Sequence, residues 1–526
     1  MNEAIVGTKS MVVSPHYLAS GAGDKILQRG GNAFDAAVAV SACLAVVYPH
    51  MTGLGGDSFW LMQQKEEGKV RAYNGSGRSG REVTRDKYRG EKAIPTRGIK
   101  SVITVPGMVD SWDAVLKKYG RMTLAEVLEP AISYALFGFP FSKDQHENTM
   151  NNLKLLGEQP DTATVFLPNG RVPHVNEKFV QKNLAHTLKE LSEKGRDFFY
   201  KGELGKRIVR SLQEKGSLLE VEDFAEHQGA WVEPLSTTYR GYTMYQVPPN
   251  SQGFVGLMTL NVLENYDLRS ISHGSYEYYH LLVEALKRTF QDRNEFLTDP
   301  HFSAIPLQNL LSKSYGKEIA NEITFEKTND VTTQPIGNDT AYAAVVDEHG
   351  NAVSFIQSLY FEFGSGVIAG DTGILMQNRG SFFSLDENHV NTLEPKKRTF
   401  HTLMPAMACK DGKPSILYGT QGGEGQPQTQ TALITRMIDY GMNPQEAISS
   451  PRFLWGRTWG EETQELKIEG RISEEVEKSL ARAGHLVKRV SDLDGVMGHA
   501  HAIVIDDQGF LHGGVDPRSD GGAFGR

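Results

Sequence analysis

The sequence has few cysteines and an excess of acidic over basic residues. Only Cys43 and Cys409 are present among 526 residues, too few for a disulfide framework or a four-thiolate zinc site. The formal net charge of −9 has the wrong sign for electrostatic binding to nucleic acid or to an anionic membrane. We therefore expect neither partner, and we expect Cys43, inside an apolar run, to be a core residue.

Long hydrophobic segments are also missing. The longest apolar run, 33–47, contains Asp35 and is too short to cross a bilayer. The first residues, MNEAIVGTKSMVV, lack a basic segment followed by an apolar stretch, which a secretory leader would need. We expect a soluble, cytoplasmic protein.

The common motifs of cofactor and metal sites are absent. The sequence holds no GxxxxGK[ST], no HExxH, no GxSxG and no GxGxxG in a strand–helix context. His499 and His501 are two residues apart without a nearby third ligand, and His280 and Glu284, one helical turn apart, are expected to be an ordinary packed or solvated pair. We expect no metal and no organic cofactor.

Glycine is abundant, with 54 residues, which favours tight loops and strand layers over a long helical bundle. Gly30-Gly31 should separate two helices, with Asn32 capping the buried helix 33–47. Apolar spacing predicts mostly helix over 113–230 and a helix over 273–297. The alternation in 238–251 predicts a strand closed by a Pro-Pro loop, and the C-terminal region should mix strands with one helix.

Thr340 stands where a polar, aperiodic stretch, 322–339, gives way to two alternating segments, TAYAAVVD and AVSFIQSL. These segments predict a hairpin that begins at Thr340. A threonine hydroxyl needs a base to act as a nucleophile, and its own α-amine can be that base if the preceding bond is cut. On spacing alone this signal is weak, and a β-branched residue that suits a strand explains Thr340.

Gly422-Gly423, within YGTQGGEG, lie between a predicted strand and a predicted helix. Successive glycines let backbone N–H groups point at one spot, as an oxyanion hole requires. Taken alone, the pair also fits a plain turn.

Together these features resemble the γ-glutamyltranspeptidase family of N-terminal-nucleophile hydrolases, over essentially the whole chain. The matching blocks include MVVSPHYLASGAGDKILQRGGNAFDAAVAVSACLAVVYPHMTGLGGDSF, ALKRTFQDRNEFLTDP, TAYAAVVDEHGNAVS, YGTQGGEG and GVDPRSDGG. The resemblance implies a four-layer αββα sandwich, made as a precursor that cuts itself before Thr340. Its products would be a large chain, 1–339, and a small catalytic chain, 340–526, which stay together in one intertwined unit.

The resemblance also implies roles for individual residues. Thr340 falls on the family's nucleophile, Ser358 on a threonine that hydrogen-bonds it, and Gly422 and Gly423 on the oxyanion glycines. Thr340 Oγ would attack an amide carbonyl, its α-amine would take the proton, and water or an amine would resolve the acyl-enzyme.

The substrate pocket departs from the family pattern. The side chains that grip the substrate's α-amine in the family fall on Tyr360, Arg379 and Phe382, none of them acidic, and Arg379 should repel an ammonium group. The paired serines that bind the α-carboxylate fall on His401 and Thr402. The family's carboxylate-binding arginine falls on Ser76, and Arg78 is a candidate substitute, although Arg78 and Arg379 would also be explained as solvated surface charges. The segment between Phe382 and His401 is short, so we expect an open site.

Several functions remain open from the sequence. The first is a γ-glutamyl hydrolase or transferase acting on glutathione-like amides. The second is an amidase for glutaryl-type acyl groups, similar to cephalosporin acylases, since arginine holds carboxylates in a bidentate fashion. A poly-γ-glutamate-processing enzyme is third. From another class, the chain would be an unprocessed, non-catalytic binder of acidic metabolites.

Overall fold

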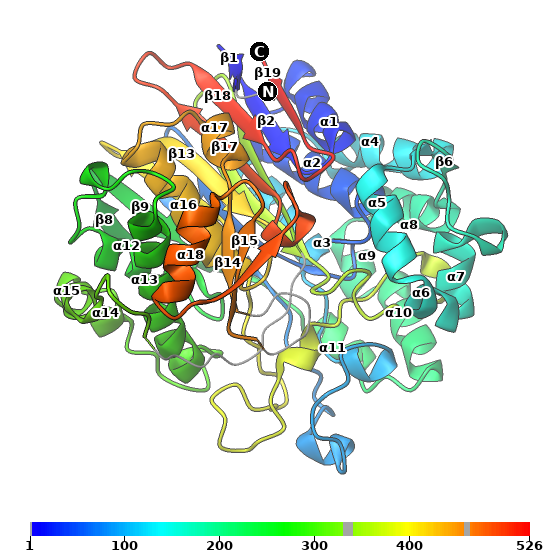
Figure 1. Ribbon diagram of the computed structural model, residues 1–526. Helices are drawn as coiled ribbons and strands as arrows, with labels where there is room; N and C mark the ends of the chain where they lie inside the picture. Colours follow the sequence, from blue (N-terminus) through cyan, green and yellow to red (C-terminus); the bar gives the residue numbers. More distant parts are fainter. Residues whose placement is uncertain (1–2, 330–339, 457–462) are drawn as a thin grey trace.

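The computed structural model describes residues 3–329, 340–456 and 463–526. Two seven-stranded sheets stand face to face between two groups of helices (Figure 1). In order across the sheet, the β10 sheet consists of β19 (Gly522–Gly525), β2 (Met11–Ser14), β10 (Ala341–Val346), β11 (Ala352–Ser358), β3 (Asp57–Gln63), β4 (Val70–Gly75) and β7 (Ala230–Val232). The β13 sheet consists of β1 (Ile5–Gly7), β18 (Leu511–Val515), β17 (Ala500–Ile505), β13 (Lys413–Thr420), β12 (Ala406–Lys410), β9 (Tyr242–Gln246) and β8 (Leu235–Tyr239).

Helices cover the outer face of each sheet. The helices on the side of the β10 sheet are α1 (Tyr17–Gln28), α2 (Ala33–Val47), α3 (Met108–Tyr119), α4 (Leu124–Phe137), α5 (Lys143–Asn151), α6 (Leu153–Glu158), α7 (Pro160–Phe166), α8 (Lys182–Lys194), α9 (Arg196–Tyr200), α10 (Glu203–Glu214) and α11 (Val221–Ala225). Those on the other side are α12 (Gly253–Leu263), α13 (Tyr276–Phe296), α14 (Leu307–Leu310), α15 (Lys313–Glu322), α16 (Gly425–Ile438), α17 (Pro444–Ser449) and α18 (Glu474–Arg482). Smaller sheets join β14 (Phe453–Trp455), β15 (Glu465–Glu469) and β16 (Leu486–Val490), and β5 (Phe139–Pro140) with β6 (Lys178–Phe179).

The period-two alternation along β10 separates the core into layers. Tyr342 and Ala344 pack between the two sheets, whereas Ala341 and Ala343 pack against the helices around α2. A third cluster lies between the β13 sheet and α12, α13 and α16. Apolar side chains on both faces of both sheets produce four layers, which confirms the expected αββα sandwich.

The N-terminal helices form as their sequence predicts. The Asn32 side chain accepts from the Asp35 N–H while the Asp35 carboxylate accepts from the Asn32 N–H, a reciprocal cap at the start of α2. All fifteen residues of α2 are buried, Cys43 included. Helical structure over 113–230 and the helix near 273–297 are likewise confirmed.

The segment 238–251 differs from the expectation of a single strand. It contains the end of β8 and all of β9, which pair as an antiparallel hairpin. The turn residues Arg240 and Gly241 have φ of 50° and 87°, the left-handed pair typical of a two-residue hairpin turn. The predicted strand structure is confirmed, but the alternation did not indicate the turn inside the segment, since arginine is uncommon at a positive φ.

The hairpin after Thr340 has the expected register. Ala341 pairs with Gln357, and Ser358 pairs with Asp57 on β3. Continuing this alternation by one residue places Thr340 beside Ser358, so the sheet carries Thr340, Ser358 and Asp57 as a row facing the other sheet. Of the polar stretch 322–339, residues 330–339 lie outside the described residues.

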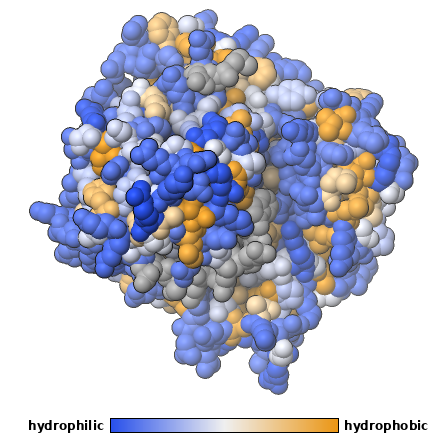
Figure 2. Space-filling model, in the orientation of Figure 1, coloured by the Kyte–Doolittle hydropathy of each residue, from blue (hydrophilic) through white to orange (hydrophobic). Residues whose placement is uncertain are grey.

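No helix in the described part of the chain is long and apolar enough to cross a membrane. On the face drawn in Figure 2, hydrophilic side chains predominate and apolar ones are scattered among them. Both ends of the described chain lie together, where β1 and β19 meet (Figure 1).

Candidate active site

Thr340 sits at the end of β10, between the sheets, and is completely buried. Its Oγ accepts a hydrogen bond from Gln426 Nε2 at 3.3 Å. Gln426 lies in the first turn of α16, directly after Gly422-Gly423. The structure therefore brings Thr340 beside the predicted oxyanion glycines, which lie over eighty residues away in sequence.

Ser358 and Tyr360 lie on the neighbouring chain segment. The Ser358 Oγ accepts from the Tyr360 N–H at 2.7 Å, and Tyr360 has a φ of 90°, which is rare for a large side chain and clusters at functional sites. This bend turns the Tyr360 ring onto Phe382, with ring centroids 4.1 Å apart. Tyr360 and Phe382, two of the three positions expected to replace the family's amine-binding side chains, thus form a stacked aromatic pair.

Arg379 lies against that pair and is 1% exposed. Its guanidinium carbon is 4.4 Å from the centre of the Tyr360 ring and 5.2 Å from that of Phe382. Its hydrogen bonds, Nη2 to Ser358 Oγ and Nη1 to Thr402 Oγ1, are both 3.5 Å long, and its Nε has no partner. Burial lowers the pKa of Arg379 to about 10, so it is a cation at neutral pH.

This placement decides between the two explanations of Arg379. A solvated surface charge would be exposed, whereas Arg379 is buried next to Ser358, which adjoins Thr340 in the sheet. A buried guanidinium has five donors and normally finds carboxylate or carbonyl partners. Here only two long contacts to hydroxyls are made, which leaves the group suited to an anionic ligand.

His401 and Asp57 form a second buried pair in this region. His401 Nε2 is 3.2 Å from Asp57 Oδ2, and burial together with Arg379 holds the pKa of His401 well below its usual value. Burial raises the pKa of Asp57 to about 6, against the opposing effect of the Arg379 charge. The neutral His401 is thus hydrogen-bonded to a carboxylate of the protein. Of the two adjacent residues His401 and Thr402, it is Thr402 that contacts Arg379.

A buried network of hydrogen bonds and an ion pair supports the loop 421–425. Gly422 and Gly423 have φ of 125° and 47°, conformations that favour glycine. Gln252 Nε2 donates to the carbonyl oxygens of Gly423 and Thr402 at 3.0 and 2.8 Å. Arg293 on α13 donates to Gln252 Oε1 at 3.2 Å and pairs with Glu424 at 2.8 Å.

Arg78 is nearer the protein surface than Arg379 is. Its side chain is 38% exposed, and its Nη1 is 3.9 Å from Asp299 Oδ2. It lines a surface depression of about 290 Å³ together with Gln228 and Lys396. Ser76, on the adjoining turn, is buried and donates to Asn74 Oδ1 at 2.6 Å. Within the described residues, Arg78 forms no hydrogen bond or ion pair with Thr340 or Arg379.

The expected open site is not what this uncut chain shows. Thr340, Ser358, Arg379 and Thr402 are each at most 1% exposed. The short segment between Phe382 and His401 therefore does not by itself leave Thr340 accessible, and the rings of Phe382 and Phe400, at its two ends, stack with centroids 5.0 Å apart.

Sequence reasoning missed Gln426, Gln252 and Arg293. Gln426 carries no motif of its own, although its position three residues after a candidate oxyanion loop, at the start of a predicted helix, was a usable signal. Arg293 lies in a segment recognised only as a matching block, and Gln252 follows the predicted Pro-Pro loop. Their convergence on Gly423 and Glu424 depends on the packing of α12 and α13 against α16.

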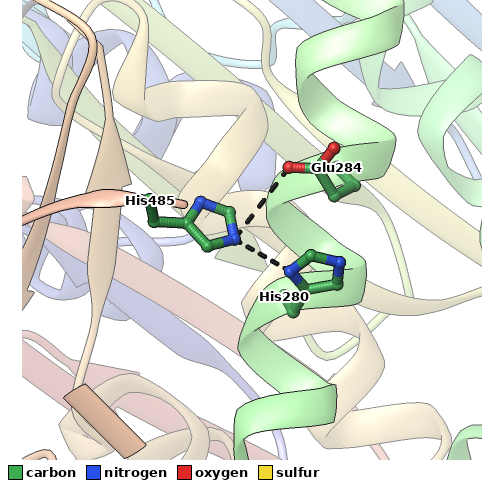
Figure 3. Close-up of side chains that lie close together, drawn as sticks. All are labelled: His280, Glu284 and His485. Atoms are coloured by element: carbon green, nitrogen blue, oxygen red, sulfur yellow. Dashed lines mark hydrogen bonds and ion pairs between the residues drawn. The ribbon is translucent and has the colours of Figure 1, made fainter. Parts of the chain in front are cut away.

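A second cluster of titratable groups lies away from this site (Figure 3). His280 and Glu284 on α13 approach His485, which precedes β16, and one ligand atom from each lies within 4.8 Å of the others. His280 Nε2 donates to the Thr324 carbonyl at 2.7 Å, so its Nδ1 accepts from His485 Nε2 at 2.8 Å. The space beside Glu284 already holds a cation, since Lys287 Nζ is 2.8 Å from Glu284 Oε1.

The spacing of these three side chains would suit a metal ion, but their hydrogen bonds account for the cluster without one. A metal would have to displace the Lys287 ammonium from Glu284 and the proton between the two imidazoles. The expectation that His280 and Glu284 are a packed pair was incomplete, because it could not foresee His485.

The fold and the threonine site together define a class, the N-terminal-nucleophile hydrolases. A model of the family described as gamma-glutamyltranspeptidase matches residues 19–526. The chain is 65% identical to the Glutathione hydrolase-like YwrD proenzyme of Bacillus subtilis (strain 168) and 40% identical to the Oxamate amidohydrolase proenzyme of Klebsiella pneumoniae, with all of both chains covered in each case. It superposes on the crystal structure of cephalosporin acylase from Bacillus halodurans with a TM-score of 0.93 and 36% identity, covering 100% of this chain and 97% of the other.

The chain therefore belongs to the γ-glutamyltranspeptidase family and is an enzyme of the amidohydrolase and acyltransferase type.

Proposed function

We propose that this protein is a self-cleaving threonine amidohydrolase for amides whose acyl group carries a carboxylate, and that Arg379 binds that carboxylate. The observation that carries the proposal is the buried guanidinium of Arg379, which has long contacts to Ser358 and Thr402 and an unpartnered Nε. Its neighbour Ser358 adjoins Thr340 in the sheet.

Self-cleavage prepares the nucleophile. In the uncut chain Thr340 Oγ attacks the carbonyl carbon of Asp339, and the ester that forms is hydrolysed by water. The products are residues 1–339 and 340–526, and the small chain begins with a free α-amine. An α-amine with a pKa of about 7.7–8.0 is a competent base near neutral pH.

Amide hydrolysis then uses the same oxygen. The α-amine takes the Thr340 Oγ proton while Oγ attacks the substrate carbonyl, and the N–H groups of Gly422 and Gly423 stabilise the oxyanion. The leaving amine takes the proton, and water resolves the acyl-enzyme. In this scheme the reaction requires no metal or organic cofactor.

Arg379 favours an acid over a zwitterion. Its planar guanidinium can bind a carboxylate through two parallel hydrogen bonds, whereas an α-ammonium in the same place would be repelled. Because Ser358 stands between Arg379 and Thr340, the acyl chain that joins the carboxylate to the scissile carbonyl should be short. The name of the 40% identical oxamate amidohydrolase agrees with a substrate that carries a carboxylate.

A γ-glutamyl hydrolase or transferase acting on glutathione-like amides is the second candidate. It is favoured by the name of the 65% identical relative. In this case the substrate's α-carboxylate would bind Arg379, and its ammonium would need a carboxylate. The buried Asp57, whose pKa burial raises and the Arg379 charge lowers, is a candidate for that partner. We propose a cytoplasmic location for either activity.

The test combines a gel with a paired release assay. Thr340→Ala should remain one full-length chain and be inactive, whereas the wild type should give two bands that co-purify. Cleaved wild-type protein should release p-nitroaniline faster from the glutaryl than from the γ-glutamyl anilide. Normal cleavage of Thr340→Ala would refute the nucleophile, and a faster γ-glutamyl reaction would replace the acid-acyl proposal by the second candidate.

A further inference from the structure

The side chain in contact with the nucleophile is an amide whose orientation is fixed. The Met404 N–H donates to Gln426 Oε1 at 3.2 Å. A backbone N–H can only donate, so Oε1 must face Met404 and the Nε2 amino group must face Thr340. The 3.3 Å contact between Nε2 and Thr340 Oγ is therefore a hydrogen bond donated to the nucleophile.

The surroundings hold Gln426 rigidly in this position. The residue is completely buried, and its own N–H donates to the Gly423 carbonyl at 3.2 Å. The Gly423 carbonyl also accepts from Gln252, which Arg293 supports from α13. Gln426 also stands in the first turn of α16, where the helix dipole favours negative charge.

We propose that Gln426 is a catalytic residue that stabilises negative charge on Thr340 Oγ, with its largest effect on the breakdown of the acyl-enzyme. This inference rests on Thr340 being the nucleophile. In that step water attacks the ester carbonyl and gives a proton to the α-amine. The bond between the carbonyl carbon and Oγ then breaks, the acid leaves, and Oγ regains a proton from the α-ammonium. Oγ departs as a developing alkoxide, and a donor already aimed at it lowers that barrier.

The same donor assists the forward attack. With one lone pair of Oγ occupied by Gln426, the hydroxyl proton is directed elsewhere, toward the α-amine once it is free. Self-cleavage uses the same oxygen and should be affected as well.

The experiment compares Gln426→Met with Gln430→Met. Methionine keeps the length of the side chain but cannot donate. Gln430 lies one turn further along α16 and donates to the Met404 carbonyl without touching Thr340, so its variant controls for the loss of a buried glutamine. For Gln426→Met we expect kcat on a glutaryl anilide to fall about 10–100-fold, with KM unchanged or lowered, and a pre-steady-state burst of p-nitroaniline. Gln430→Met should keep kcat within about threefold of the wild type, as a site away from the reacting atoms.

Gln426→Glu supplies a second readout that a purely structural role would not produce. When ionised, this glutamate cannot donate to Oγ, but its protonated form can. Its activity relative to the wild type should therefore recover as the pH falls below the pKa of the new carboxyl, which burial raises.

The outcomes separate this inference from the proposed function. If Gln426→Met cleaves itself and turns over at the wild-type rate, or if Gln426→Glu shows no relative recovery at low pH, the role of Gln426 is wrong while Thr340 can stand. If Thr340→Ala cleaves normally, the nucleophile itself is wrong. A wild type that cleaves itself but hydrolyses neither anilide would leave the cleavage rate of Gln426→Met as the deciding measurement.

Discussion

Two regions of the molecule bury arginines in opposite ways. Arg452 and Arg518 share the carboxylate of Asp516, and Arg518 also pairs with Glu469, all fully buried. Arg379 is as deeply buried but pairs with no carboxylate within 4 Å in the described part of the chain, and it contacts two hydroxyls and two aromatic rings.

We interpret this difference as separating a structural charge from one that, under the proposed function, binds a ligand. The desolvation cost of Arg452 and Arg518 is offset by nearby carboxylates and by carbonyls such as those of Met497 and Gly498. The cost of burying Arg379 is offset much less, which the proposed function explains as stability given up for binding. The comparison predicts that removing a charge will have opposite effects on stability in the two regions.

The largest expected effect on stability is at Asp516. Asp516→Asn should lower the free energy of unfolding by about 3–5 kcal/mol, because it leaves two buried guanidinium groups without their shared anion. Denaturant unfolding followed by circular dichroism measures the change. Asp507→Asn is the matched control, since Asp507 is 90% exposed and, among the described residues, forms an ion pair with Lys410 alone. It should change the unfolding free energy by less than about 0.5 kcal/mol. Equal effects of the two substitutions would contradict the comparison.

Arg379→Met should behave in the opposite way. We expect kcat/KM on the glutaryl anilide to fall about 30-fold or more, because a carboxylate would lose its charged partner. The free energy of unfolding should stay unchanged or rise, since an incompletely compensated buried charge is removed. Arg379→Lys keeps the charge without the planar fork and should be intermediate in activity. A strong loss of stability in Arg379→Met would show that Arg379 is structural, like Arg452.

The pocket can also be returned toward the family pattern. Arg379→Gln combined with Phe382→Asp removes the cation and supplies an acid for an α-ammonium. The ratio of γ-glutamyl to glutaryl release should rise by about tenfold or more, since opposite charge replaces like charge. An unchanged ratio would mean that these two positions do not contact the acyl group. Each single variant should shift the ratio less than the pair.

The last prediction concerns the histidine cluster of Figure 3, whose effect on stability should be seen only when the pH is lowered. Burial, with Lys287 and His280, lowers the pKa of His485 to about 3. The unfolded chain binds a proton at about pH 6.5, so stability from this group is complete above that pH and is lost as the pH falls toward 3. Between pH 7 and pH 5, His485→Gln should lose about 2 kcal/mol less unfolding free energy than the wild type.

The control for this measurement is His186→Gln, because the His186 side chain is 67% exposed. It should keep the wild-type dependence of stability on pH. If His485→Gln also keeps that dependence, the pKa of His485 is not lowered when the chain folds, and burial does not hold this imidazole neutral.

Much of the fold followed from local sequence signals. The reciprocal cap of Asn32 and Asp35, the all-buried helix α2 and the hairpin that follows Thr340 depend on residues within a few positions of one another. The turn at Arg240–Gly241 was missed because only the second of its residues is a turn former by composition. The network of Gln252, Arg293 and Glu424 was missed because its members lie on separate elements, and nothing local indicates that they meet.

The sequence by itself determined the family, the layers of helix and strand, and the identity of Thr340, Gly422 and Gly423 as candidates, because each depends on residue type and short-range order. Only the tertiary structure decided that Arg379 is buried against Tyr360 and Phe382, that His401 is occupied by Asp57, and that Gln426 points its amino group at Thr340. The reason is physical: burial and hydrogen-bond direction are properties of the groups that surround a side chain, and those groups come from distant parts of the chain.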